Sequence, residues 1–308
     1  MVQPNDAADE VEGDLMLEVR HLTRRFGDLI AVDDVSFQVP AGQMIGFVGG
    51  NGAGKTTTMR MIMGLLSPSS GEVLWDGSPI TTQIRSKIGY MPEERGLYPK
   101  QGVLDQLTYL GQLKGSSKQA ANAEASELLA RFGLAERTEE KLEKLSLGNQ
   151  QRVQIAASLL AKPVALILDE PFSGLDPKGI DEMAGLLADE AARGVPVLFS
   201  SHQLDLIDRL CDGLVILASG KVVAKGTKDE LESHGPLRHR LVVDGDAGWL
   251  RGMPDVEVDS LDGGTALLRL QRSGMESQLL QQALQRGNVL EFAQVRPTLS
   301  EIYREVTA

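Results

Sequence analysis

Hydrophobic residues change their spacing several times along this chain, and each change predicts a new element of structure. Met44-Ile45-Gly46-Phe47-Val48 is a short apolar run of the kind that forms a buried strand. Four apolar residues then recur at helical spacing: Met59, Ile62, Met63 and Leu66. Because Pro68 cannot continue a helix, the pattern predicts a strand, a Gly-rich turn and a helix that ends before Pro68.

Strand and helix patterns alternate over most of the chain. Short alternating segments between 15 and 39 predict antiparallel strands, and residues from about 102 to 162 predict an inserted helical subdomain. The run 165–168 is apolar throughout, which is typical of a strand buried on both faces of a parallel sheet. A helix pattern at about 180–192 precedes an apolar strand at 197–199. We therefore predict an α/β fold whose ligand lies at the carboxyl ends of the strands.

The two ends of the chain differ from this middle part. Residues 1–14 are acidic and polar, which predicts a flexible tail. Residues 236–308 predict a small α+β domain, with helical stretches near 246–252 and 275–286. Their β-α-β-β-α-β order suits a ferredoxin-like unit, and a final helix is predicted at 298–306.

Charge and hydropathy limit the partners that the chain can have. The formal net charge is −12 and there is no dense Lys/Arg run, so we expect no nucleic-acid partner. No apolar run reaches the roughly 18–20 residues that cross a bilayer, and the N-terminus lacks the basic start and apolar core of a signal peptide. We expect any work at a membrane to be done from its soluble side. The single cysteine, Cys211, excludes a disulfide framework.

The turn after the first buried strand carries the strongest chemical signal. Residues 49–57, Gly-Gly-Asn-Gly-Ala-Gly-Lys-Thr-Thr, fit the G-x-x-x-x-G-K-[ST] pattern of a phosphate-binding loop. The candidate binding residues are Gly49, Asn51, Gly52, Ala53, Gly54, Lys55, Thr56 and Thr57. Glycines let the backbone approach a polyphosphate, and N–H groups at the following helix N-terminus form an anion site. Lys55 can reach the outer phosphates and the Thr56 hydroxyl can ligate Mg²⁺, so we predict a nucleotide site.

A second signal follows the apolar run 165–168. That strand ends in Asp169-Glu170, which places two carboxylates beside the predicted loop. Asp169 suits the Mg²⁺ shell, directly or through water. Glu170 is placed to orient and polarise an attacking water molecule.

In their order along the chain, the motifs resemble those of the ATP-binding subunits of ABC transporters. Leu145-Ser146-Leu147-Gly148-Asn149-Gln150-Gln151-Arg152 looks like the family signature, and 166–171 looks like its Walker B strand. Ser173-Gly174-Leu175-Asp176 matches the D-loop, and His202 matches the switch histidine. The resemblance covers about residues 15–235, which we assign to one ATP-binding domain.

This resemblance implies roles for residues that the loop alone does not explain. Phe26 falls where the family's aromatic residue stacks on adenine, and His202 would bond the γ-phosphate. Ser146 and Gly148 lie at a predicted helix N-terminus and would meet the γ-phosphate held by a second subunit, and Asp176 of the D-loop is a further candidate for binding the nucleotide. The implied catalytic residues are Glu170, His202 and Lys55.

The same resemblance implies the ligands and partners. The ligands are ATP and Mg²⁺, and the activity is ATP hydrolysis coupled to transport. The partners are a second copy in a head-to-tail dimer and a separate integral-membrane permease, with the chain at the cytoplasmic face of the membrane. Residues 92–99, together with the C-terminal extension, are similar to bacterial exporters of the sodium-extrusion and drug-resistance kind. The transported cargo is recognised by the permease and is not encoded here.

Three positions depart from the family pattern, and one of them is Asn149, which stands where the family commonly has glutamine. Leu147 stands where the family usually has glycine, and it would be strained if that position required a positive φ. Glu93 stands where the family has a glutamine that reaches Mg²⁺ and the attacking water. We predict that Glu93 keeps the metal contact and alters coupling to the permease. The alternative is that Glu93 faces solvent beside Arg95.

Other functions remain to be weighed. A soluble ABC-type ATPase that acts on ribosomes or nucleic acid is one alternative. Such relatives usually carry two ATPase cassettes, long coiled coils or zinc cysteines, none of which is evident here. A GTPase switch would need an Asn-Lys-x-Asp motif, which the sequence lacks.

Overall fold

The structure is a computed structural model that describes residues 16–94, 96–234, 237–272, 274–296 and 298–307. The acidic tail at 1–14 and Arg95 lie outside the described residues. The chain divides into two compact units, Met1–Gly226 and Thr227–Ala308. The second unit begins before the boundary predicted at 235–236.

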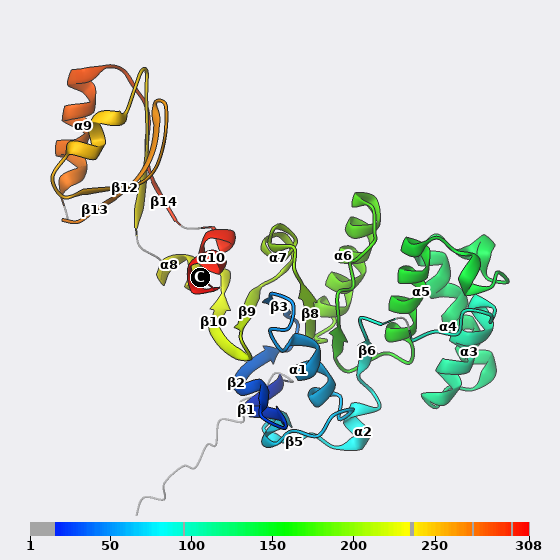
Figure 1. The fold of residues 1–308 in the computed structure, drawn as a ribbon. Coiled ribbons are helices and arrows are strands. Elements are labelled where there is room, and N and C mark those ends of the chain that lie inside the picture. The colour runs from blue at the N-terminus through cyan, green and yellow to red at the C-terminus, as the bar shows by residue number, and fades with distance from the viewer. Residues whose placement is uncertain (1–15, 95, 235–236, 273, 297, 308) are drawn as a thin grey trace, which may run out of the picture. The chain divides into compact units, whose positions relative to one another are not determined.

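A six-stranded sheet forms the centre of the first unit (Figure 1). Its order is β10 (Lys221–Thr227), β9 (Gly213–Ala218), β3 (Met44–Gly49), β8 (Val197–Ser201), β7 (Leu166–Leu168), β6 (Gly89–Met91). The pairs β9–β3, β3–β8, β8–β7 and β7–β6 are parallel. Every residue of β3, β7 and β8 is buried, as a strand covered on both faces requires. The predicted α/β sheet is confirmed.

A second sheet, which is antiparallel, is formed by strands that precede and follow the phosphate loop in the sequence. Its order is β2 (Leu29–Pro40), β1 (Met16–Phe26), β4 (Ser70–Trp75), β5 (Ser78–Pro79). Helix α1 (Lys55–Ile62) packs between this sheet and β3, and Met59 and Ile62 are fully buried there. The antiparallel β subdomain is therefore confirmed. Its buried residues form one hydrophobic cluster with Ala53 of the loop.

The remaining helices of this unit are α2 (Thr82–Arg85), α3 (Val103–Leu113), α4 (Lys118–Arg131), α5 (Leu147–Leu159), α6 (Pro177–Ala192) and α7 (Leu204–Leu210), with 3₁₀ turns η1 (Ala135–Arg137) and η2 (Leu142–Lys144). Helices α3, α4 and α5 group together, and α5 also packs on β6 (Figure 1). A Cβ on Gly89 of β6 would lie 2.2 Å from the Ser158 carbonyl oxygen of α5. Only glycine permits this approach, which ties the helical group to the central sheet.

The second unit is a small α+β domain, as predicted. Its elements are α8 (Lys228–His234), β11 (Arg238–Val243), η3 (Gly248–Gly252), β12 (Val256–Asp262), β13 (Thr265–Leu270), α9 (Met275–Arg286), β14 (Val289–Val295) and α10 (Leu299–Thr307). The antiparallel sheet has the order β12-β13-β11-β14. The first predicted helix is only the 3₁₀ turn η3, because Gly248 and Gly252 bound a segment too short to propagate an α-helix.

None of the helices in the described ranges combines the length and apolar character that crossing a bilayer requires.

Candidate functional site

The phosphate loop joins the end of β3 to the start of α1. Gly52 and Gly54 have φ angles of +77° and +104°. A Cβ on Gly54 would lie 2.8 Å from the Ala31 carbonyl oxygen of β2, so this position requires glycine for both its backbone conformation and its space. Gly54 caps α1 without a side-chain hydrogen bond, which leaves the N-terminal N–H groups of the helix for an anion.

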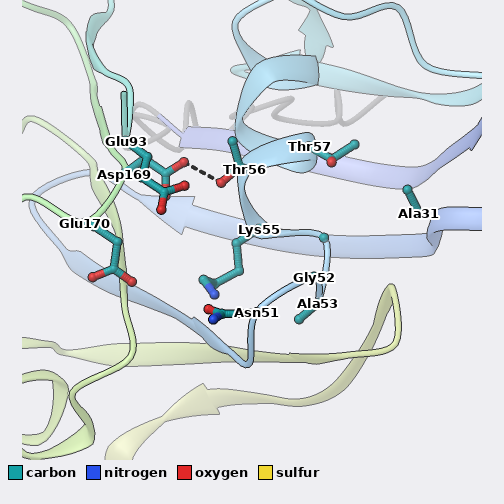
Figure 2. Close-up of a pocket in the computed structure, with 11 residues that line it drawn as sticks. Ala31, Asn51, Gly52, Ala53, Lys55, Thr56, Thr57, Glu93, Asp169 and Glu170 are labelled. Atoms are coloured by element: carbon teal, nitrogen blue, oxygen red, sulfur yellow. Dashed lines mark hydrogen bonds between the residues drawn. The ribbon is translucent and has the colours of Figure 1, made fainter. Parts of the chain in front are cut away.

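A cavity of about 270 Å³ opens over this loop (Figure 2). It is lined by Ala31, Asn51, Gly52, Ala53, Gly54, Lys55, Thr56, Thr57, Glu93, Asp169 and Glu170. Figure 2 shows the three carboxylates on one side and the loop with Lys55 and Asn51 on the other. Gly49, the last residue of β3, instead accepts a 2.6 Å hydrogen bond from Lys55 Nζ through its carbonyl. The cavity therefore has a cationic, N–H-rich wall and an acidic wall, which suits a polyphosphate with a divalent cation.

Asp169 is held by two hydroxyl groups at the end of β7. Thr56 Oγ1 donates to its Oδ2 at 2.7 Å, and Ser200 Oγ donates to its Oδ1 at 2.6 Å. The Asp169 side chain is buried next to the loop, at 1% exposure. The Thr56 hydroxyl and the Asp169 carboxylate are oxygen donors that fit Mg²⁺. Among the described residues, no group of three or more acidic, His or Cys side chains is placed to hold a metal ion.

Glu170 occupies an unusual backbone conformation, with φ at +53°. Its N–H donates to Ser200 Oγ at 2.8 Å, and its carbonyl accepts from Gln151 Nε2 at 3.0 Å. Its carboxylate contacts His202 Nδ1 at 3.0 Å. Burial raises the pKa of Glu170 above its usual value, and His202 and Lys55 act in the opposite direction. A carboxylate with a raised pKa is a stronger base, so the geometry suits proton transfer from water.

Glu93 lies beside these acids, although its side chain is exposed to solvent. It lines the loop cavity, and Gln154 Nε2 donates to the preceding Pro92 carbonyl at 2.9 Å, which fixes the segment. The Glu93 side chain is therefore both exposed to solvent and part of the cavity wall. The metal contact proposed from the sequence stays a prediction.

A neighbouring hollow of about 320 Å³ shares the carboxylate wall. It is lined by Asn51, Glu93, Leu147, Gln151, Glu170, Ser173, Gly174 and His202. Asp176 lines neither hollow; its carboxylate accepts from the Gly179 N–H at 3.1 Å and caps α6. The nucleotide-binding role of Asp176 stays a prediction.

Two candidates in the signature segment, Ser146 and Gly148, lie outside the loop cavity. Ser146 caps α5, accepting from the Asn149 N–H at 3.4 Å, and its side chain is exposed. Gly148 is in the first turn of the same helix, and a Cβ there would lie 3.1 Å from the Gly174 carbonyl oxygen. Leu147 starts the helix without a positive φ, so the strain considered for it is absent.

Phe26 ends β1 with 46% of its surface exposed, and it does not line the cavity. The Arg24 guanidinium carbon lies 4.6 Å from its ring centre. Its stacking on adenine stays a prediction.

Sequence reasoning missed Ser200, Gln151 and Ala31. Ser200 directly follows the apolar residues of β8, so its place at the carboxyl end of a predicted strand was a usable signal for a site residue, although not for its partners. Gln151 lies in the signature segment, but its contact with Glu170, like that of Ala31 with the loop, arises between segments distant in the sequence and had no local signal.

Comparison with known proteins agrees with this geometry. The ABC transporter family model matches residues 32–173, and the model for the C-terminal domain of DrrA1-3-like ATP-binding proteins matches 226–307. The chain is 40% identical to the uncharacterized ABC transporter ATP-binding protein YhaQ of Bacillus subtilis (strain 168), over 94% of this chain and 98% of that protein. It is 35% identical to the Nod factor export ATP-binding protein I of Burkholderia lata, over 71% of this chain and 77% of that protein. A solved ATP-binding subunit of an ABC transporter matches with a TM-score of 0.66 and 33% identity, over 71% of this chain and 92% of that one.

Proposed function

This chain belongs to the ABC transporter ATP-binding proteins, and from that premise we propose that it drives an export permease by closing head to tail with a second copy around ATP. Membership in the family carries the predicted activity with it: the chain binds ATP with Mg²⁺ and hydrolyses the ATP. The residue roles, the dimer geometry and the direction of transport are our proposals.

Within one copy, each wall of the loop cavity has its own task. The loop N–H groups and Lys55 would hold the outer phosphates, and Thr56 and Asp169 would hold Mg²⁺, which would neutralise charge on the phosphates when bound. Glu170 accepts the proton of the attacking water, and His202 holds the Glu170 carboxylate in place at 3.0 Å and reaches the γ-phosphate.

The observation that carries the dimer proposal is the position of the signature helix. Ser146 and Gly148 lie at the N-terminus of α5, outside the cavity that holds the loop. A helix N-terminus attracts phosphate oxygens, and this one is exposed at Ser146. We infer that it completes the site of a second copy, so that two ATP molecules lie between facing subunits.

A mixing experiment tests this geometry. Lys55→Ala impairs the loop and Ser146→Arg impairs the signature helix, so either variant alone has two defective sites. In a head-to-tail dimer, a mixture of the two variants contains dimers with one intact site, and ATP hydrolysis should recover in part. Recovery should be strongest near equal concentrations. A mixture no more active than its components would refute the shared site.

We also propose that Glu93 contacts the metal shell and transmits the nucleotide state to the permease. It lines both hollows, next to Asp169 and Glu170. Replacing Glu93 with Gln removes a negative charge and keeps the side-chain length. If ATP affinity, Mg²⁺ dependence and turnover were all unchanged, this role would be wrong.

The permease itself is a partner at the membrane, with this chain peripheral on the cytoplasmic face. A groove of about 500 Å³, lined by Lys100, Gln101, Gly102, Asp105 and Tyr109, lies where α3 begins. Tyr109 exposes 51% of its surface there, and aromatic residues are frequent anchors of protein interfaces. We propose this groove as the permease contact. Tyr109→Ala should weaken co-purification with the co-expressed permease and leave ATP binding by the isolated chain unchanged; equal recovery of the complex would count against it.

Export is proposed because a relative of this chain is described as an export ATP-binding protein. Transport into inside-out vesicles that contain the permease and this chain would test the direction. ATP-driven uptake of cargo into such vesicles supports export, and ATP-driven release from them would oppose it.

A further inference from the structure

One buried hydroxyl group forms hydrogen bonds with both acidic residues of the site, Asp169 and Glu170. Ser200 lies at the end of β8 with 0% of its surface exposed. Its Oγ is 2.6 Å from Asp169 Oδ1 and 2.8 Å from the Glu170 backbone nitrogen. Two strands that are distant in the sequence are therefore joined at the point where the acids leave β7.

The direction of both hydrogen bonds is fixed by the atoms available. The Glu170 N–H can only donate, so Ser200 Oγ must accept there. The single hydroxyl hydrogen of Ser200 is then free to point at the Asp169 carboxylate. Because the serine hydroxyl has one hydrogen and both partners are present, its rotation is restricted to this arrangement.

Glu170 depends on such support because its φ of +53° is uncommon for a residue with a side chain. Gln151 Nε2 holds the Glu170 carbonyl, and His202 Nδ1 contacts the carboxylate. Ser200 is the contact that holds the N–H. Without it, the backbone can relax toward an ordinary conformation, which would turn the Glu170 carboxylate away from its place beside Asp169.

We propose that Ser200 is a positioning residue for hydrolysis, which holds Glu170 in a fixed relation to Asp169. This rests on the proposed role of Glu170 as the acceptor of the water proton. The hydrogen bonds of Ser200 Oγ go to Asp169 and to the Glu170 N–H, and Ser200 is connected to Thr56 of the loop only through Asp169, so we expect it to act on the chemical step more than on ATP binding. A displaced catalytic group commonly slows a reaction by about 10- to 100-fold.

The test uses the full chain with Ser200→Ala, Glu170→Gln, the double variant, and Ser158→Ala as the control. Ser158 is also buried, and its hydroxyl donates to Ile155 within its own helix, away from both hollows. For Ser200→Ala we expect kcat to fall about 10- to 100-fold, while KM and the separately measured Kd for ATP stay within about threefold. Ser158→Ala should keep kcat within about twofold. Single-turnover rates should show that Ser200→Ala adds at most about a twofold loss in the Glu170→Gln background.

Each result separates this inference from the proposed function. A Ser200→Ala variant with kcat within twofold of the parent, or with ATP affinity falling in step with kcat, overturns the positioning role. An equal loss in both backgrounds also overturns it, because Ser200 would then not act through Glu170. If Glu170→Gln itself kept full turnover, the role of Glu170 would fall as well.

Discussion

Substituting Gly54 with Ala measures how much the loop geometry contributes to ATP binding. The added methyl group meets two costs. An alanine at φ +104° is in a region that residues with a Cβ rarely adopt, which costs roughly 1–2 kcal/mol. Its Cβ would also lie 2.8 Å from the Ala31 carbonyl oxygen and 3.3 Å from Val32 Cγ2, and relieving such overlap costs about 1–2 kcal/mol more.

The total of about 2–4 kcal/mol must appear in one of two measurements. If the loop keeps its shape, the protein is less stable and Tm falls by roughly 2–4 °C per kcal/mol. If the loop relaxes, ATP binds about 30- to 700-fold more weakly, since 1.4 kcal/mol corresponds to a factor of ten. Thermal unfolding and equilibrium binding of ATP, measured on the same sample, should give losses that sum to this range.

Gly77→Ala is the matched control. Gly77 has φ +71° in the turn between β4 and β5, and a Cβ there meets nothing within 4 Å. Gly77→Ala should lower the free energy of unfolding only by the roughly 1–2 kcal/mol of placing alanine at a positive φ, and it should leave ATP affinity unchanged. If Gly54→Ala lost no more stability than Gly77→Ala and bound ATP normally, the close approach of Ala31 would not constrain the loop.

Three further predictions concern the carboxylates and the second unit. Thr56→Ala removes the hydroxyl that donates to Asp169, so turnover should fall about 10- to 100-fold and require a higher Mg²⁺ concentration. The affinity for ATP without metal should stay near the parent value. An unchanged dependence of turnover on Mg²⁺ concentration would contradict this. Because burial raises the pKa of Glu170, its ionised form destabilises the folded state, and this cost appears as pH rises through the folded-state pKa. Glu170→Gln should therefore raise Tm at pH 8, with a gain that shrinks toward pH about 4; a gain independent of pH would refute the assignment. In the second unit, Arg238→Ala removes partly buried ion pairs with Asp259 and Glu301 and should lower the free energy of unfolding by about 1–3 kcal/mol. The exposed Arg240→Ala should lower it by only about 0–1 kcal/mol. Equal shifts in Tm for the two variants would contradict this difference.

Local chemistry made much of this fold predictable. The run at 165–168 is apolar at every position, and a strand covered on both faces requires that pattern. The helix predicted near 246–252 was overestimated, because the segment is only five residues long with glycine at both ends and forms the 3₁₀ turn η3. The phosphate loop was visible because its glycines, lysine and threonine act through a continuous stretch of backbone.

The sequence by itself determined the residue types that can hold a triphosphate, since Lys55, Thr56, Asp169 and Glu170 each carry their chemistry wherever they lie. Only the tertiary structure decided how those groups meet. Ser200 reaches Asp169 and Glu170 because β7 and β8 are neighbours, and Gly54 is required because β2 passes behind the loop. Both facts depend on segments far apart along the chain being packed together, and no local pattern of side chains records which strand will lie beside which.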